Sequence, residues 1–104
     1  MTTKTSTRNA ADLISKRQPF TTSGSLHGEA PVGSLTGWGA TGRLPTEHAD
    51  ALLADHRKGR VTYIVWSYGT PIAWHAVDAG WTVPDVRYSV TTSRHQGEVR
   101  RAVL

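Results

Sequence analysis

A row of hydroxyl groups ending at an imidazole lies in the stretch YSVTTSRHQG, residues 88–97. Eight of its ten side chains can form hydrogen bonds. If the stretch is an extended strand, alternate side chains point to opposite faces. One face then packs, and the other carries the row Ser89, Thr91, Ser93 and His95. Each buried hydroxyl would need its own hydrogen-bond partner, so we expect the row to lie at a surface.

Two interpretations of this row stay open. An exposed strand needs no function to explain its threonines, because threonine is a good strand former. Alternatively, the row contacts phosphates or a polar protein partner, with Tyr68, Trp74 and Trp81 near enough to stack against bases. Two tryptophans beside glycines, Trp38 and Trp81, are candidates for exposed anchors of a protein partner. The candidate binding surface therefore comprises Tyr88, Thr91, Ser93, Arg94, His95, Gln96, Arg100, Arg101, Trp38 and Trp81.

The sequence contains fragments of catalytic and nucleotide-binding motifs, but their contexts are wrong. Residues 37–42 match G-x-G-x-x-G. The glycines of that motif normally follow a buried strand and open directly into a helix, whereas here Pro45 still precedes the next helix. Ser67 lies in W-S-Y-G rather than in the G-x-S-x-G elbow. We expect residues 37–42 to form a loop and the protein not to be an enzyme.

Metal and cofactor sites are not indicated either. The five histidines, at positions 27, 48, 56, 75 and 95, include no pair at the i, i+4 spacing that places two imidazoles on one helical face. The chain has no cysteine, which removes thiolate ligands and disulfides. We therefore predict neither a metal nor a cofactor.

The elements that would position these residues are clearest in the second half of the chain. Residues 46–58 combine acidic residues in the first turn, basic residues in the last and a glycine after the end, which predicts a helix. Residues 61–68, 72–77 and 86–92 are rich in β-branched and aromatic side chains and predict strands. Residues 61–68 are apolar on both faces, as in a central strand.

The predicted fold class is α+β. We expect an antiparallel β-meander of three to five strands with the 46–58 helix packed on one face, and a short N-terminal helix that starts near Asn9 and stops before Pro19. The polar, threonine-rich residues 1–8 are expected to be a disordered tail, and residues 9–104 a single domain.

Charge and hydropathy set the remaining expectations. The net charge is +4, and the basic excess lies in the two terminal segments rather than the middle. Such termini suit phosphate contacts, and they equally suit soluble chain ends. No segment is apolar enough for a signal peptide or a membrane span, and the lack of cysteine suits a reducing compartment. We expect a cytoplasmic protein without membrane contact, and a free sheet edge leaves homodimerisation open.

The pair WSYGTPIAWH (66–75) and YSVTTSRHQG (88–97) resembles a family of small proteins encoded by actinobacteriophages and their actinobacterial hosts, which are described only as a domain of unknown function. The resemblance implies a phage accessory protein acting inside the bacterial host cell, and it implies no catalytic residues. Our leading hypothesis is therefore a non-catalytic protein that binds a host protein. The alternative is a small nucleic-acid-binding protein that uses the basic termini and the 88–97 strand.

Overall fold

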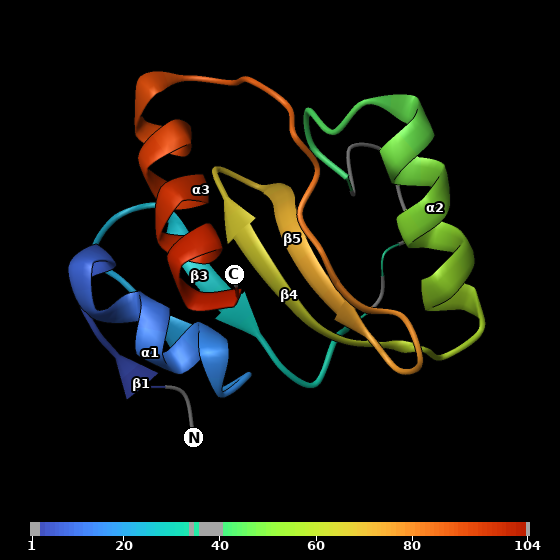
Figure 1. The fold of residues 1–104 in the computed structure, drawn as a ribbon, viewed down its shortest axis with the longest axis horizontal. Helices are drawn as coiled ribbons and strands as arrows, with labels where there is room; N and C mark the ends of the chain where they lie inside the picture. The colour runs from blue at the N-terminus through green and yellow to red at the C-terminus, as the bar shows by residue number, and fades with distance from the viewer. Residues whose placement is uncertain (1–2, 34, 36–40, 104) are drawn as a thin grey trace.

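The computed structural model describes residues 3–33, 35 and 41–103 of the 104-residue chain (Figure 1). Its elements, in chain order, are β1 (Thr3–Lys4), the 3-10 helix η1 (Thr7–Asn9), α1 (Ala10–Ser15), β2 (Phe20–Thr21), β3 (Leu26–Glu29), α2 (Thr46–Arg57), β4 (Val61–Ser67), β5 (Thr70–Ala76), β6 (Gly80–Thr82) and α3 (Val90–Val103). The fold class is α+β, as predicted. No helix in the described ranges is long and apolar enough to span a bilayer.

The strands form one sheet in which spatial order follows chain order, from β1 to β6. All neighbouring pairs are antiparallel except β1 and β2, which are parallel. The sheet has six strands rather than three to five, because β1 and β2 are two-residue strands with no periodic pattern to predict them. The central place of β4, between β3 and β5, agrees with its apolar side chains on both faces.

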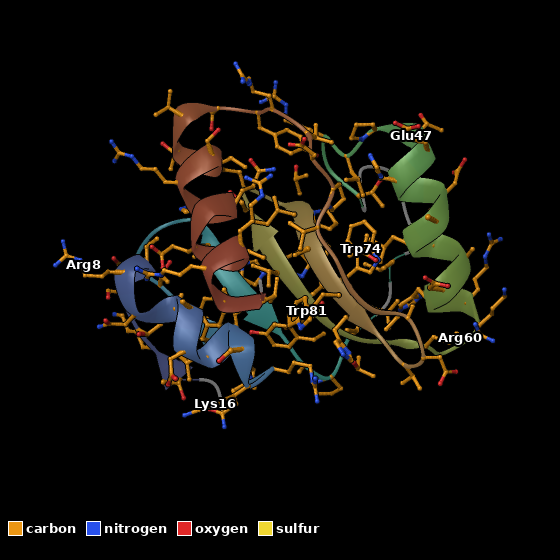
Figure 2. All side chains as sticks on the ribbon, viewed as in Figure 1. Arg8, Lys16, Glu47, Arg60, Trp74 and Trp81 are labelled. Atoms are coloured by element: carbon orange, nitrogen blue, oxygen red, sulfur yellow. The ribbon has the colours of Figure 1, made fainter. Side chains whose placement is uncertain are left out.

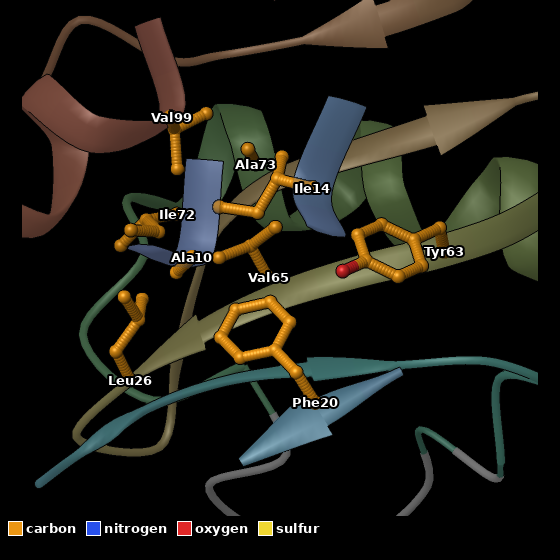
Figure 3. Packing of buried hydrophobic residues seen from close by; sticks show 9 residues of the cluster. All are labelled: Ala10, Ile14, Phe20, Leu26, Tyr63, Val65, Ile72, Ala73 and Val99. Carbon is orange, nitrogen blue, oxygen red and sulfur yellow. The ribbon is translucent and has the colours of Figure 1, made fainter. Parts of the chain in front are cut away.

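Helices cover both faces of this sheet, whereas the sequence predicted a helix on one face only. On one face, Ala10 and Ile14 of α1 and Val99 of α3 pack with the sheet. Figure 3 shows this cluster, whose labelled members are Ala10, Ile14, Phe20, Leu26, Tyr63, Val65, Ile72, Ala73 and Val99. On the other face, α2 packs against a second cluster that contains Trp74 (Figure 2). The result is three layers, with the sheet in the middle (Figure 1).

Helix α2 forms where it was predicted, and its ends have local causes. It begins at Thr46, directly after Pro45, whose fixed φ suits the start of a helix. It ends at Arg57, and Gly59 closes it with φ +69°, a conformation that glycine adopts without steric cost. Ala49 and Leu52 form its buried stripe against the sheet.

The predicted strand over residues 86–92 is wrong. Residues 83–89 form a linker, which passes between α3 and α2 in Figure 1, and α3 starts at Val90. The side chain of Ser89 accepts a hydrogen bond from the amide of Thr92 at 3.1 Å, which is an N-cap contact. Good helix formers, among them Gln96, Arg100 and Arg101, follow from position 94 onward. The cap and these residues outweigh the strand preference of Val90, Thr91 and Thr92.

The N-terminal segment has more regular structure than its composition predicts. Residues 3–8, expected within a disordered tail, contain β1 and the start of η1. The amides of Thr3 and Thr5 donate to the carbonyls of Pro19 and Thr21, so β1 is held by backbone hydrogen bonds that do not depend on side-chain type. The predicted short helix near Asn9 is confirmed as α1.

Candidate functional site

A cavity of about 360 Å³ opens at the end of the β4–β5 hairpin, beside the N-terminus of α3. Its volume lies near the lower end of the range of small-molecule pockets. We call it the Tyr88 cavity. The described residues that line it are Arg43, Ser67, Tyr68, Thr70, Tyr88, Ser89, Thr91 and Thr92. Seven of these eight side chains carry a hydroxyl, the eighth carries a guanidinium, and none is a carboxylate.

Under the cavity, three hydroxyls and an imidazole form a chain of hydrogen bonds. Ser89 Oγ donates to Thr92 Oγ1 at 3.2 Å. Thr92 Oγ1 lies 3.1 Å from Ser67 Oγ, which lies 2.7 Å from Nδ1 of His95. Because Thr92 accepts from Ser89, its own proton is available to Ser67, and Ser67 can donate to His95. This direction leaves the proton of a neutral imidazole on Nε2.

The protonation state of His95 agrees with this direction. Burial lowers the pKa of His95 below its usual value, so the imidazole is neutral near pH 7 and Nδ1 can accept. The ring also stacks on that of Tyr68, with centroids 6.3 Å apart and planes 27° apart. Two elements distant in sequence, the β4–β5 hairpin and α3, are thus joined by a chain of side-chain hydrogen bonds.

The Ser67–His95 pair has the spacing of a nucleophile and its base, but Ser67 is buried. Ser67 is 1% exposed, and its oxygen is already within hydrogen-bond distance of both Thr92 and His95. A nucleophile must be open to its substrate. We therefore interpret the pair as the floor of the Tyr88 cavity, which fixes the position of α3 against the hairpin.

The Tyr88 phenol and the Arg43 guanidinium set the electrostatics of the cavity wall. Burial raises the pKa of Tyr88, and the positive charge of Arg43 opposes that rise, so this cation lies close to the phenol. The Tyr88 hydroxyl oxygen is buried, and it has no hydrogen-bond partner within the described part of the chain. An unpaired buried hydroxyl costs about 1–3 kcal/mol.

The structure divides the residues of the predicted binding surface between several places. Tyr88 and Thr91 line the Tyr88 cavity, and His95 lies beneath it. Ser93, Gln96 and Arg100 instead line a smaller hollow of about 160 Å³ together with residues 85–87. Gln96 is buried there and donates to the carbonyl of Val86 at 2.8 Å. The predicted surface is thus not one continuous row, because a helix distributes these residues around its axis.

The basic residues and tryptophans of that surface lie elsewhere still. Arg100 pairs with Asp85 at 3.4 Å, and Arg101 pairs with Glu98 and donates to the carbonyl of Arg8. Both arginines belong to the last turn of α3, at the opposite end from Ser89 and Thr92. Arg94 is exposed on the same helix. Trp81 is half-buried, edge-on to the rings of Tyr63 and His75, and Trp38 lies outside the described residues.

Several residues of the cavity were not predicted from the sequence. Arg43 and Thr70 had no role assigned, and Ser67 was considered only as a nucleophile. One signal was available: Thr92, His95, Gln96 and Val99 have the i, i+3, i+4, i+7 spacing of a buried helical stripe, and all four are buried. The stripe was missed because three of its four members are polar.

Acid should destabilise the fold through its histidines. Burial is the main cause that lowers the pKa of His27, His75 and His95 below 6.5 in the folded protein. The unfolded chain therefore binds more protons, and the free energy of unfolding falls as the pH drops from about 7 through 6.5. We expect a lower urea midpoint at about pH 5.5 than at about pH 7, and a smaller difference in His95→Gln. An unchanged pH dependence in that variant would contradict a contribution from His95.

Comparison with known proteins identifies a family. The model of a family described as a family of unknown function (DUF8033) matches residues 1–102. No curated protein and no solved structure matches the chain.

Proposed function

Since the chain belongs to that family of unknown function, we propose from the site itself that it is a non-catalytic binding protein whose ligand carries a phosphate or similar anion. The observation that carries this proposal is the lining of the Tyr88 cavity, with seven hydroxyls, one guanidinium and no carboxylate. Arginine and hydroxyl donors are the groups that hold phosphate oxygens in proteins.

The position of α3 supports the same ligand class. Thr91 and Thr92, which line the cavity, belong to the first turn of this fourteen-residue helix. The amides of a first turn lack partners within their own helix, and the helix dipole favours negative charge there. Ser89 satisfies the amide of Thr92 through its side chain and that of Ser93 through its carbonyl. Donors from the helix and from Arg43 therefore lie around one cavity.

This proposal places phosphate binding ahead of host-protein binding, which was the leading hypothesis from the sequence. Binding of a host protein was expected through an exposed apolar patch at Trp38 or Trp81; Trp81 packs against the core, and Trp38 lies outside the described residues. Binding through the terminal arginines required them to lie beside the hydroxyl row, but Arg100 and Arg101 are at the other end of α3. Within the proposal, the resemblance to actinobacteriophage proteins supplies the setting, the cytoplasm of a bacterial host cell.

Replacing Arg43 by alanine tests the proposal. Its backbone amide donates to Thr70 Oγ1 at 2.9 Å, a contact that the variant keeps, so the segment should stay in place. We expect inorganic phosphate or ribose 5-phosphate to bind the wild type, and Arg43→Ala to weaken the tighter of the two about tenfold or more. Binding is measured from amide chemical shifts during titration, where the first turn of α3 should respond. The effect should shrink as salt is raised.

Arg57→Ala is the matched control, because Arg57 is an exposed arginine on α2 and does not line the cavity. It should bind like the wild type. A triple Arg94, Arg100, Arg101 alanine variant tests the site expected from the sequence. The proposal fails if neither anion binds, or if the loss of affinity occurs in the triple variant and not in Arg43→Ala.

A further inference from the structure

An exposed aromatic ring stands at the rim of the Tyr88 cavity. Tyr68 is 61% exposed and lines the cavity at the tip of the β4–β5 hairpin. One side of its ring stacks on His95. The degree of exposure leaves the other side open to solvent. A planar group placed there would extend a stack that already consists of an imidazole and a phenol ring.

The backbone makes tyrosine an unfavourable choice at this position. Ser67 pairs with Thr70, so Tyr68 and Gly69 form a two-residue hairpin turn, and both have positive φ, at +53° and +76°. Turns of this type favour asparagine, aspartate or glycine at the first position. A β-carbon is sterically unfavourable at positive φ, so the tyrosine is kept in a conformation that its own residue type disfavours. Compared with asparagine, tyrosine adds an aromatic ring at this position.

The ring and the cation meet at one cavity. Among the described residues that line it, Arg43 is the single charged residue and Tyr68 the one exposed aromatic ring. Hydroxyls of Ser89 and Thr91 lie in the same wall. A ligand that matches all three features has an anionic group, a polar middle and a flat aromatic end. A nucleotide has these parts in this order: phosphate, sugar and base.

We propose that the ligand of the Tyr88 cavity is a nucleotide whose base stacks on the exposed face of Tyr68 while its phosphate meets Arg43 and the first turn of α3. This inference rests on the proposed function and adds the chemical class of the ligand. The sugar hydroxyls lie against the hydroxyl-lined wall. Stacking accepts any base, so the site discriminates nucleotides from sugar phosphates more strongly than one base from another.

The test compares adenosine 5′-monophosphate with ribose 5-phosphate, which differ at C1 of the ribose, where the first carries adenine and the second a hydroxyl. We expect the nucleotide to bind roughly fivefold or more tightly, the value of one stacking contact. Tyr68→Phe keeps the ring and should preserve this ratio, whereas Tyr68→Asn should bring it close to one. A third measurement uses a short single-stranded oligonucleotide with a 5′ phosphate. Tighter binding of the oligonucleotide than of the free nucleotide would assign the site to strand ends, and weaker binding would assign it to free nucleotides.

The two proposals fail in different ways. Equal affinity for the nucleotide and the sugar phosphate, or an unchanged ratio in Tyr68→Asn, overturns the nucleotide inference and leaves the anion site standing. If inorganic phosphate, ribose 5-phosphate and the nucleotide all fail to bind, both proposals are overturned.

The same variant makes a prediction about stability. Tyr68→Asn places a favoured residue at positive φ without removing a buried side chain, so its melting temperature should rise by up to about 5 °C. Tyr68→Phe keeps the unfavourable backbone and should melt like the wild type. Thermal unfolding by circular dichroism measures both. A lower melting temperature in Tyr68→Asn would show that the tyrosine stabilises the hairpin. It would contradict the conclusion that the turn disfavours tyrosine at this position.

Discussion

Gly42→Ala is expected to reduce the free energy of unfolding by about 2–5 kcal/mol and to weaken ligand binding at the same time. Gly42 has φ +54°, and a β-carbon there would lie 2.5 Å from the carbonyl oxygen of Gly69 and 2.8 Å from Cα of Thr70. Both atoms belong to the backbone of the β4–β5 hairpin, so neither can rotate away. The segment that carries Arg43 would have to move off the hairpin, and the cation would leave the cavity wall.

Two other glycines separate the causes of this loss. Gly59 also has positive φ, +69°, but no atom lies within 4 Å of an added β-carbon. Gly59→Ala should therefore cost only the backbone strain, about 1–2 kcal/mol. Gly24→Ala meets nothing closer than 3.8 Å, at Thr22 Oγ1, and should cost less still. Urea unfolding gives the three values. If Gly42→Ala costs no more than Gly59→Ala, the close approach to the hairpin is not what holds Arg43 in place.

Gly42 also shows what a sequence motif can and cannot specify. It is the last glycine of the G-x-G-x-x-G match in residues 37–42, and in that motif the glycines serve a bound pyrophosphate. Gly37 and Gly39 lie outside the described residues. At Gly42 the backbone approached is that of the protein's own hairpin. The sequence predicted only a loop over residues 37–42, and the hairpin atoms that Gly42 approaches are 27 and 28 residues away, where no local pattern indicates them.

The parts of the fold that could be predicted are those decided by neighbours in sequence. The ends of α2 follow from Pro45, Arg57 and Gly59, and β4 is recognised by apolar side chains on both of its faces. Helix α3 was missed because its start was judged from the β-branched Val90 and Thr91 rather than from the cap at Ser89. In a marginal segment, one capping side chain outweighs several intrinsic preferences.

The site was harder to predict because its contacts are long-range. Ser67 and His95 are 28 positions apart, and the amide of Arg43 reaches Thr70 across 27. The sequence did indicate a group of hydroxyls that ends at an imidazole. That group exists, with different members: Thr92 and Ser67 of β4 take the places expected for Thr91 and Ser93. Tertiary packing chose which hydroxyls meet, and spacing along one segment carries no information about it.

Trp74→Ala should reduce the free energy of unfolding by about 3–5 kcal/mol, a large part of the total stability of a small domain. Trp74 is 1% exposed on β5 and packs with Ala49 and Leu52 of α2, so alanine would leave a cavity under that helix. Urea unfolding measures the loss.

Trp66→Ala is the matched control on the neighbouring strand. Trp66 packs at the margin of the same cluster but is only half-buried, with its ring stacked on His27 and its indole nitrogen donating to Glu29. Less of its surface is withdrawn from water, so the loss should be smaller. Equal losses would mean that the free energy of unfolding lost on this face does not depend on how deeply the tryptophan is buried against α2.

The two faces of the sheet should then respond independently. Trp74 lies in the cluster under α2, whereas the Tyr88 cavity is built from the hairpin end, the start of α3 and Arg43. Under conditions where Trp74→Ala remains folded, its affinity for ribose 5-phosphate should match that of the wild type, because Trp74 does not line the cavity. Leu44, which follows Arg43, belongs to the cluster of Trp74, but the amide of Arg43 is held separately by Thr70. Arg43→Ala should show the reverse, with lost affinity and near-normal stability. A loss of affinity in folded Trp74→Ala would mean that β5, which carries both Thr70 and Trp74, couples the helical layer to the cavity.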